Sequence, residues 1–424
     1  MTPSKVRVAI IGGGIGGLTF AVALKECSDL QVDLYEQAHQ ITEIGAGITL
    51  WHRGYEILKS LGMKDDLVKL LNEESKDLDK QKLSFQYRFS DRKDGVEYFG
   101  LYSKGGARLF HRQEIQQMLL KHVPEFVTIH LSHQLERCEE GQDSVRLIFK
   151  DGFEATCDIV VAADGIKSVV RDSIPNDGVL PMGTNVFRGL IPREKLEKLY
   201  PDHSCLEHPT FLCGKSQYIV SFPISQERTI NVGACVTKLE NEGKPLNGSG
   251  VRRSTTQEVL DLFVGWEDQA VQLIENMENP VCYALQELHP LKTYISRRIA
   301  LVGDAAHGMT PYLAAGAGQA IEDAFILGRL FSEAGPENWA RVFEAYNLAR
   351  QPLGNKVQLD SRSQGFYLQL NAPEFENVRE SRDLTHEQIE ILRKSFTKHW
   401  SWLNGDVDQE LTRASEFLNS AKVF

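Results

Sequence analysis

The chain has 424 residues, of which 42% are hydrophobic and 25% charged, proportions typical of a globular protein with two or three domain-sized cores. Its formal net charge of −11 argues against non-specific binding to nucleic acid or to an anionic membrane, since both need a basic protein face. No apolar run approaches the roughly 18 residues that a membrane-spanning helix requires, so we expect no stable membrane insertion.

The seven cysteines are odd in number, are scattered along the chain and form no CxxC pair. Single cysteines in apolar or strand-like surroundings are more often buried thiols than disulfides or metal ligands, as in a reducing compartment. The first strand-like run begins at Val6, which leaves no room for a signal or transit peptide before it. We therefore expect a cytoplasmic protein without a bound metal.

The first motif along the chain is a strand, a glycine turn, a helix and a second strand. Val6–Ile11 is a short apolar run, the turn is Gly12-Gly13-Gly14-Ile15-Gly16-Gly17, and apolar residues at helical spacing continue to Leu24. Val32–Tyr35 predicts the second strand. Glu36 follows it, at the distance where an acidic residue accepts hydrogen bonds from a ribose hydroxyl.

Each glycine of this turn has its own task in a nucleotide site. Gly12 allows the tight turn, Gly14 lets the backbone approach a pyrophosphate, and Gly17 lets the helix pack closely on the strand. The start of the helix then offers unpaired N–H groups to the phosphates. A glycine turn alone is weak evidence, but this strand, helix and acid around it predict a dinucleotide site.

A glycine-bracketed loop at 44–50 comes next, and Gly47 permits a close backbone approach to a flat ligand. The following patterns predict helices at 54–61 and 64–71, a hairpin of 82–90 with 96–99, and an amphipathic helix at 112–122. Arg112 stands at the start of that helix, where a guanidinium can reach back to the nucleotide. The alternative, a solvated arginine at a helix end, stays open.

Two further strands end in an acidic residue and glycines. Residues 157–163 predict a buried parallel strand ending in Asp164-Gly165, and residues 299–303 predict another ending at Asp304. Ligands of open α/β sheets bind at the carboxyl ends of strands. Gly316-Ala317-Gly318 opens a later helix whose first N–H groups suit an electron-rich ligand. One elongated cofactor such as FAD explains all of these ends together.

Between these ends the pattern changes to that of an antiparallel sheet inserted into the α/β core. The predicted strands are 184–191, 205–212, 218–223 and 229–236, a polar loop covers 244–253, and helices follow at 256–263 and 268–276. The segments 338–370 and 386–403 are helical and are expected to pack on the first domain.

The chain resembles the single-component aromatic-ring flavoprotein monooxygenases with the hydroxybenzoate hydroxylase fold, and among them the salicylate hydroxylase-like branch. The resemblance covers nearly the whole chain and rests on residues 12–17, 162–171, 303–307, 316–319 and 322–324. It implies an α/β protein with a Rossmann-like FAD-binding domain, an inserted antiparallel β-sheet substrate domain and a helical C-terminus. The expected divisions are 1–182 and 296–370 for FAD binding, 183–295 for the substrate sheet, and 371–424 for the C-terminal helices.

The resemblance implies an enzyme that uses FAD, NAD(P)H and O2 to hydroxylate a phenolic aromatic acid of salicylate or 4-hydroxybenzoate type. The reaction would pass through a C4a-hydroperoxyflavin, with or without oxidative decarboxylation. The expected FAD-binding residues are Gly12, Gly14, Gly17, Glu36, Gly47, Arg112, Asp164, Gly165, Asp304, Pro311, Gly316, Ala317 and Gly318. Asp164 and Arg171 would also serve NAD(P)H.

Arg188 is the first candidate to hold a carboxylate or phenolate of the substrate, with Tyr218 and Tyr312 as hydrogen-bonding partners. An ion pair inside the sheet is the alternative for Arg188. His307 lies within Ala-Ala-His-Gly beside the flavin turn, where we expect a structural role. Pro311-Tyr312-Leu313 stands where many salicylate hydroxylases carry Pro-His-Gln.

Two other functions stay open from the sequence. One is a secondary-metabolite flavin oxygenase, an epoxidase or a dearomatising hydroxylase, that acts on a terpenoid or polyketide. The other is a nucleotide-binding protein or an NAD-linked dehydrogenase, which rests on the glycine turn alone. We expect a small aromatic molecule and O2 as the partners, and a monomer or homodimer.

Overall fold

The computed structural model describes residues 5–41, 47–71, 80–246 and 248–420. Its first layer is a parallel five-stranded sheet in the order β18-β11-β1-β2-β7. The strands are β1 (Val6–Ile11), β2 (Leu30–Tyr35), β7 (Val127–His130), β11 (Ile159–Ala162) and β18 (Ile299–Leu301). Ile11 pairs with both Tyr35 and Ala162, and Ala162 pairs with Leu301, so four carboxyl ends lie side by side.

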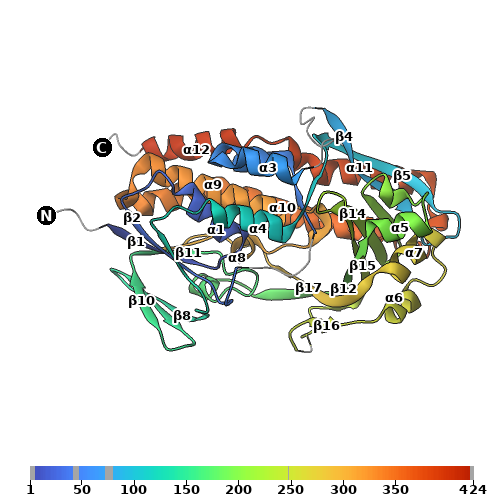
Figure 1. Cartoon of the computed structure of the whole chain (residues 1–424), viewed down its shortest axis with the longest axis horizontal. Helices are drawn as coiled ribbons and strands as arrows, with labels where there is room; N and C mark the ends of the chain where they lie inside the picture. Colours follow the sequence, from blue (N-terminus) through green and yellow to red (C-terminus); the bar gives the residue numbers. More distant parts are fainter. Residues whose placement is uncertain (1–4, 42–46, 72–79, 247, 421–424) are drawn as a thin grey trace.

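Helices cover one side of this sheet and a small antiparallel sheet lies on the other (Figure 1). The helices are α1 (Ile15–Ala23), α4 (Arg112–Lys121), α9 (Gly316–Ala334), α10 (Trp339–Leu368) and α12 (Val407–Ser420). The small sheet has β8 (Leu135–Glu140), β9 (Val145–Phe149) and β10 (Glu154–Cys157). All nine residues of α1 are buried, because the helix is apolar all round and packs between the sheet and α9.

The second layer is an eight-stranded sheet in the order β16-β17-β12-β15-β14-β13-β4-β5, antiparallel except for the parallel pair of β13 and β4. Its strands are β4 (Gln81–Phe89), β5 (Val96–Lys104), β12 (Val179–Pro192), β13 (Thr210–Gly214), β14 (Gln217–Ile224), β15 (Thr229–Glu242), β16 (Val251–Arg253) and β17 (Glu278–Leu288). Figure 1 shows this sheet beside the first layer, with the long helix α10 running toward it.

The structure differs from the sequence prediction in three parts of this sheet. The predicted strand 205–212 is wrong in its first half, because Ser204–Leu206 is a 3₁₀ turn and β13 begins only after Pro209. The strand β17 was not predicted, since Pro280 and the left-handed Asn279 (φ 45°) interrupt its alternation. The exposed edge strand β16 occupies the end of the predicted polar loop.

The hairpin β4–β5 belongs to the eight-stranded sheet, where β4 pairs with β13 across more than a hundred residues of sequence. The helix α11 (His386–His399) also packs there rather than on the first domain, because the Phe396 ring lies 5.0 Å from Tyr87 and 5.4 Å from Phe99. Neither partnership follows from local spacing.

The remaining elements lie around the two layers. They are β3 (Gly47–Leu50), β6 (Arg108–His111), α2 (His52–Leu58), a π-helical turn (Lys59–Met63), α3 (Lys64–Leu70), α5 (Arg193–Leu199), α6 (Thr256–Leu262), α7 (Asp268–Asn276) and α8 (Asp304–His307). Short 3₁₀ turns occur at Val170–Ser173, Pro311–Leu313, Pro336–Asn338, Pro373–Phe375, Ser381–Asp383 and Trp400–Asn404. Within the described ranges, no helix is long and apolar enough to cross a membrane.

Candidate active site

The glycine turn after β1 leaves no room for side chains at two positions. Gly12 has a φ of +104°, and a Cβ there would lie 2.4 Å from the carbonyl oxygen of Ala163. A Cβ on Gly17 would lie 2.0 Å from the carbonyl oxygen of Gly12. The tight turn and the close approach of helix to strand therefore both require glycine.

Glu36 lies at the same turn. Its Oε2 accepts a hydrogen bond of 2.7 Å from the N–H of Gly13, and its Oε1 accepts one of 2.8 Å from the N–H of Ala38. The carboxylate thus holds the glycine turn against the end of β2. Its contact with a ribose stays a prediction. The carboxylate oxygens keep further lone pairs that can accept a hydrogen bond from a ribose hydroxyl.

A cavity of about 390 Å³ lies between the carboxyl ends of the parallel strands and one face of the eight-stranded sheet. The predicted cofactor residues that line it are Gly14, Gly47, Arg112, Gly165, Asp304, Pro311, Gly316 and Ala317. A Cβ on Gly14 or Gly165 would meet nothing within 4 Å, so the backbone is open toward the cavity at both points. The predicted residues 44–46 of the glycine-bracketed loop lie outside the described residues.

The opposite wall comes from alternate residues of β12, β14 and β15. In the register of the sheet, Arg188 of β12 stands opposite Gly233 of β15, which stands opposite Val220 of β14. Tyr218 and Asn231 lie two residues away on either side of this row. The aromatic residues Phe85, Phe211 and Phe222 complete this wall, and Leu285 and Met309 close it. Phe85 and Leu285 were not predicted as wall residues, because the sequence did not show that β4 and β17 belong to this sheet. The alternation of the aromatic residues Phe85, Tyr87 and Phe89 was the local signal for β4.

Arg188 is a charged group in a mostly apolar wall. Its guanidinium lies 5.9 Å from the centre of the Tyr283 ring. Arg188 forms no ion pair with a carboxylate within the described ranges. The alternative from the sequence, an ion pair inside the sheet, is therefore not found there. An arginine in this setting presents its fork of N–H donors to whatever enters the cavity.

Tyr218 is 2% exposed and stands opposite Cys235 in the sheet. Burial raises the pKa of Tyr218 well above its ordinary value, so the hydroxyl keeps its proton at neutral pH. Burial likewise raises the pKa of the Cys235 thiol to about 12. Both groups therefore act on a ligand as neutral hydrogen-bonding groups.

Tyr312 lies behind this wall and does not line the cavity. Its hydroxyl accepts a hydrogen bond of 3.3 Å from Gln369 Nε2, and its ring lies 5.8 Å from that of Tyr218. Burial raises the pKa of Tyr312 to about 12. The position of Tyr312 favours a supporting role beneath Tyr218 over contact with a substrate.

Asp164, Arg171 and Gly318 also lie outside the cavity lining. Asp164 Oδ2 accepts hydrogen bonds from the N–H groups of Val169 (2.9 Å) and Val170 (3.3 Å). Arg171 is 3% exposed and donates to the carbonyl oxygens of Ile166 and Ala305. Asp164 and Arg171 thus hold the loop after β11 together, and their role toward NAD(P)H stays a prediction.

The cavity fits an elongated cofactor with a pyrophosphate. Open backbone at Gly14 and Gly165, the starts of α1 and α9, and the cation Arg112 all suit phosphate oxygens or an electron-rich ring. Asp304 is exposed to the cavity while Gly303 and Ala305 on either side of it are buried. No group of three or more histidine, cysteine, aspartate or glutamate side chains in the described part of the chain is arranged to hold a metal.

Comparison with known proteins agrees with this geometry. The FAD binding domain family matches residues 5–360. A salicylate hydroxylase of Pseudomonas putida is 31% identical over 427 residues, covering 96% of this chain and 94% of that protein. A 6-methylsalicylate 1-monooxygenase of Aspergillus terreus is 31% identical over 373 residues, covering 85% of this chain and 82% of that protein.

The fold agrees as well. The solved structure of a salicylate hydroxylase substrate complex has a TM-score of 0.80 and 28% sequence identity, covering 97% of this chain and 98% of that one. The matched residues include all of the glycine turns and strand ends described above. The chain belongs to the FAD binding domain family and is a salicylate hydroxylase-like, FAD-dependent aromatic monooxygenase.

Proposed function

We propose that this enzyme hydroxylates a phenolic aromatic acid of hydroxybenzoate type, with NAD(P)H and O2 as co-substrates. The observation that carries the proposal is Arg188, a cation without a protein carboxylate partner in the described ranges, in an aromatic wall of the FAD cavity. A guanidinium binds a carboxylate through two parallel hydrogen bonds. The names of the two relatives given above, salicylate and 6-methylsalicylate enzymes, support a ring that carries both a carboxylate and a hydroxyl.

Bound FAD would supply the redox chemistry, in which NAD(P)H provides two electrons and O2 provides one oxygen atom to the ring and one to water. The chain supplies position and electrostatics. The first N–H groups of α9, at Gly316 and Ala317, have no acceptor within the helix and stabilise negative charge at that wall of the cavity. The rings of Phe85, Phe211 and Phe222 exclude water from the opposite wall.

Tyr218 orients the phenolic oxygen of the substrate in this proposal. Because its own hydroxyl stays protonated, it donates a hydrogen bond to a phenolate and thereby favours the ionised, more nucleophilic ring. Arg188 and Tyr218 lie in neighbouring rows of the sheet, two residues apart in register, so both reach one small ring.

Tyr218→Phe is expected to lower kcat about 10-fold, because it removes one hydrogen bond to the charged form of the substrate, worth about 1.5 kcal/mol. Tyr312→Phe is the matched control, since Tyr312 lies behind the wall, and we expect less than a threefold change. Steady-state rates of NAD(P)H oxidation coupled to product formation measure both. Equal losses in the two variants would contradict the assignment of Tyr218.

Gly233→Val is expected to raise the KM for the aromatic acid about 10-fold with little change in melting temperature. A Cβ at Gly233 lies at ordinary contact distance, 3.4 Å from Val220 and 3.8 Å from Val186, so the sheet accepts it. The further methyl groups would enter the cavity beside Arg188 and displace the ring. Thermal melting and KM on the same preparation separate the two effects.

Where the hydroxyl enters at the carbon that bears the carboxylate, that carbon loses CO2. One acid, one NAD(P)H, one O2 and two protons then give one dihydroxybenzene, CO2, NAD(P)+ and water. Hydroxylation at another carbon keeps the carboxylate and releases no CO2. That reaction consumes one proton instead of two.

The proposal is tested by NADH and NADPH oxidation and O2 uptake across a panel of 2-, 3- and 4-hydroxybenzoates and their alkylated derivatives. The carboxyl carbon is labelled, and products and CO2 are analysed by mass spectrometry. We expect stimulated oxidation with a stoichiometric hydroxylated product for at least one acid. Oxidation without hydroxylated product, or no stimulation by any phenolic acid, would contradict the proposal and favour a terpenoid or polyketide substrate.

A further inference from the structure

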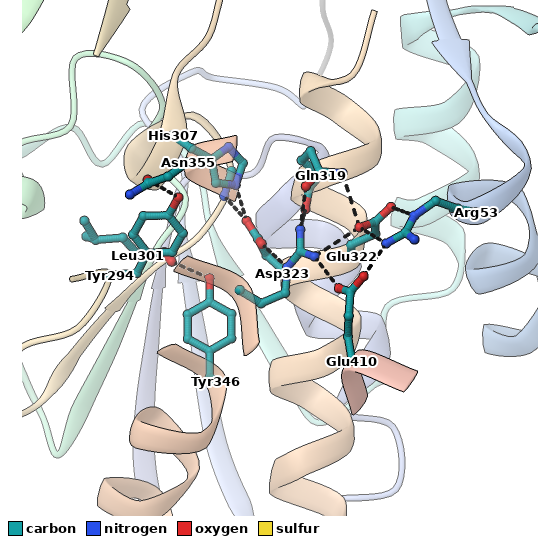
Figure 2. A network of polar contacts seen from close by, with 12 residues as sticks. Arg53, Tyr294, Leu301, His307, Gln319, Glu322, Asp323, Tyr346, Asn355 and Glu410 are labelled. Atoms are coloured by element: carbon teal, nitrogen blue, oxygen red, sulfur yellow. Dashed lines mark hydrogen bonds and ion pairs between the residues drawn. The ribbon is translucent and has the colours of Figure 1, made fainter. Parts of the chain in front are cut away.

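A buried network of charged side chains lies behind the cavity, between the helices that carry it (Figure 2). Its ionisable members are Arg53, His307, Glu322, Asp323, Arg350 and Glu410, which come from α2, α8, α9, α10 and α12. His307, Glu322, Asp323 and Arg350 are each 0% exposed. Buried charges of this kind persist only when each is paired and hydrogen-bonded.

Arg350 is the centre of the network. Its Nε donates to Asp323 Oδ1 at 2.7 Å, and its Nη1 donates to Glu410 Oε2 at 2.8 Å and Glu322 Oε2 at 3.1 Å. Its Nη2 donates to Gln319 Oε1 at 2.8 Å. One guanidinium thus joins α10 to α9 and α12.

Arg53 joins the same carboxylates from the other side. Its Nε and Nη2 donate to the two oxygens of Glu322 at 2.8 Å each, and its Nη2 also donates to Glu410 Oε1 at 2.7 Å. Figure 2 shows Glu410 below Arg53, with a dashed line joining the two side chains. Arg53 thus joins α2 to α9 and α12.

Asp323 differs from the other carboxylates because it bonds to the segment 303–307, which follows β18 and whose first two residues line the cavity. Its Oδ2 accepts from the backbone N–H of Gly303 at 2.9 Å and from Nε2 of His307 at 2.6 Å. Gly303 and His307 are the residue before α8 and the last residue of α8. Asp304, the first residue of α8, lines the cavity directly after Gly303. One carboxylate oxygen therefore holds both ends of the short helix that presents Asp304.

The backbone at position 303 favours glycine. Gly303 has a φ of +60°, and a Cβ there would lie 3.0 Å from the Cβ of Ala320 on α9.

Although burial alone would raise the pKa of Asp323, His307 and Arg350 hold that pKa below its ordinary value, so the side chain is a carboxylate that accepts all three bonds.

We propose that Asp323 is a positioning residue for the flavin: its bonds to Gly303 and His307 set where Asp304 meets the cofactor, and Arg350 keeps Asp323 in place. The inference rests on FAD binding, which the family shows, and does not depend on the identity of the substrate. It follows that FAD affinity depends on a residue that does not line the cavity.

The test is FAD binding to the apoprotein, followed by quenching of flavin fluorescence, for Asp323→Asn and for the matched control Glu410→Gln. Each variant removes one negative charge from the same buried network, so both lower the melting temperature of the apoprotein. Of these two carboxylates, Asp323 accepts hydrogen bonds from Gly303 and His307, whereas Glu410 accepts them from Arg53 and Arg350. We expect Asp323→Asn to weaken FAD binding about 10-fold or more, and Glu410→Gln to change it less than threefold.

A second pair of variants keeps the test open if Asp323→Asn does not fold. His307→Gln retains an N–H donor near the position of Nε2, whereas His307→Leu removes it at similar volume. We expect FAD affinity near that of the wild type for His307→Gln and a loss of several-fold for His307→Leu. A shift in the visible absorption bands of bound FAD should accompany each loss, because the contact with Asp304 changes.

Three results would overturn the proposal. They are wild-type FAD affinity in folded Asp323→Asn, equal affinity of the two His307 variants, and equal weakening of FAD binding in Asp323→Asn and Glu410→Gln. The last result would show that loss of a buried charge acts through general destabilisation and not through the turn at Gly303.

Discussion

Replacing Arg188 by methionine is expected to lower kcat/KM for a hydroxybenzoate about 100-fold while the content of bound FAD stays unchanged. The substitution keeps most of the apolar stem of the side chain and removes the guanidinium that we propose binds the carboxylate. Truncating one partner of a buried, hydrogen-bonded charge pair costs about 2 to 5 kcal/mol, and 1.4 kcal/mol corresponds to a factor of ten.

The measurement compares the acid with the corresponding phenol, which lacks the carboxylate. We expect the variant to lose activity on the acid alone. Arg252→Met is the matched control, because Arg252 is an arginine of the same sheet that pairs with Glu258 and lies over the Phe187 ring at 5.8 Å, away from the cavity. A fall of the same size for acid and phenol would show that Arg188 does not hold the carboxylate.

Gly14→Val is expected to weaken FAD binding about 10- to 100-fold without lowering the melting temperature of the apoprotein. Gly14 has a φ of −74°, which suits any residue, and a Cβ there meets no atom within 4 Å. The added side chain would instead occupy the space in which the backbone approaches the pyrophosphate. Overfilling a packed contact costs about 1 to 3 kcal/mol, which corresponds to the stated range.

Gly17→Ala is the contrasting variant for this experiment. Its Cβ would lie 2.0 Å from the carbonyl oxygen of Gly12, so we expect the apoprotein itself to melt at a lower temperature. Differential scanning calorimetry of the apoproteins and FAD titration of the same samples separate the two glycines. A lower melting temperature for Gly14→Val would show that Gly14 serves the fold as Gly17 does.

Much of the FAD side of the cavity was predictable from the sequence because its signals are local. The glycine turn at 12–17, the strand end at Gly165 and the helix start at Gly316 each combine an apolar run with small residues within about ten positions. Arg188 was a candidate for a different reason, because Phe187-Arg188-Gly189 resembles a substrate-sheet strand of the family. His307 was expected to be structural, and its bond to Asp323 agrees.

Other assignments needed the tertiary structure, because they depend on which distant segments pair. Tyr312 lies three positions after Met309 and one after Pro311, both of which line the cavity, yet it is turned toward Gln369 of the C-terminal region. No local pattern contains that partner. The same holds for Phe85, which reaches the cavity wall only because β4 pairs with β13.

The sequence by itself determined the cofactor class and the places where the chain must turn without a side chain, since close backbone contacts allow only glycine there. The tertiary structure decided which side chains line the cavity and which carboxylate bonds to Gly303 and His307. Asp323 is one of two adjacent acidic residues in α9, and its bonds to Gly303 and to His307 of α8 distinguish it from Glu322. Such pairing depends on long-range packing, which the period of a single helix does not contain.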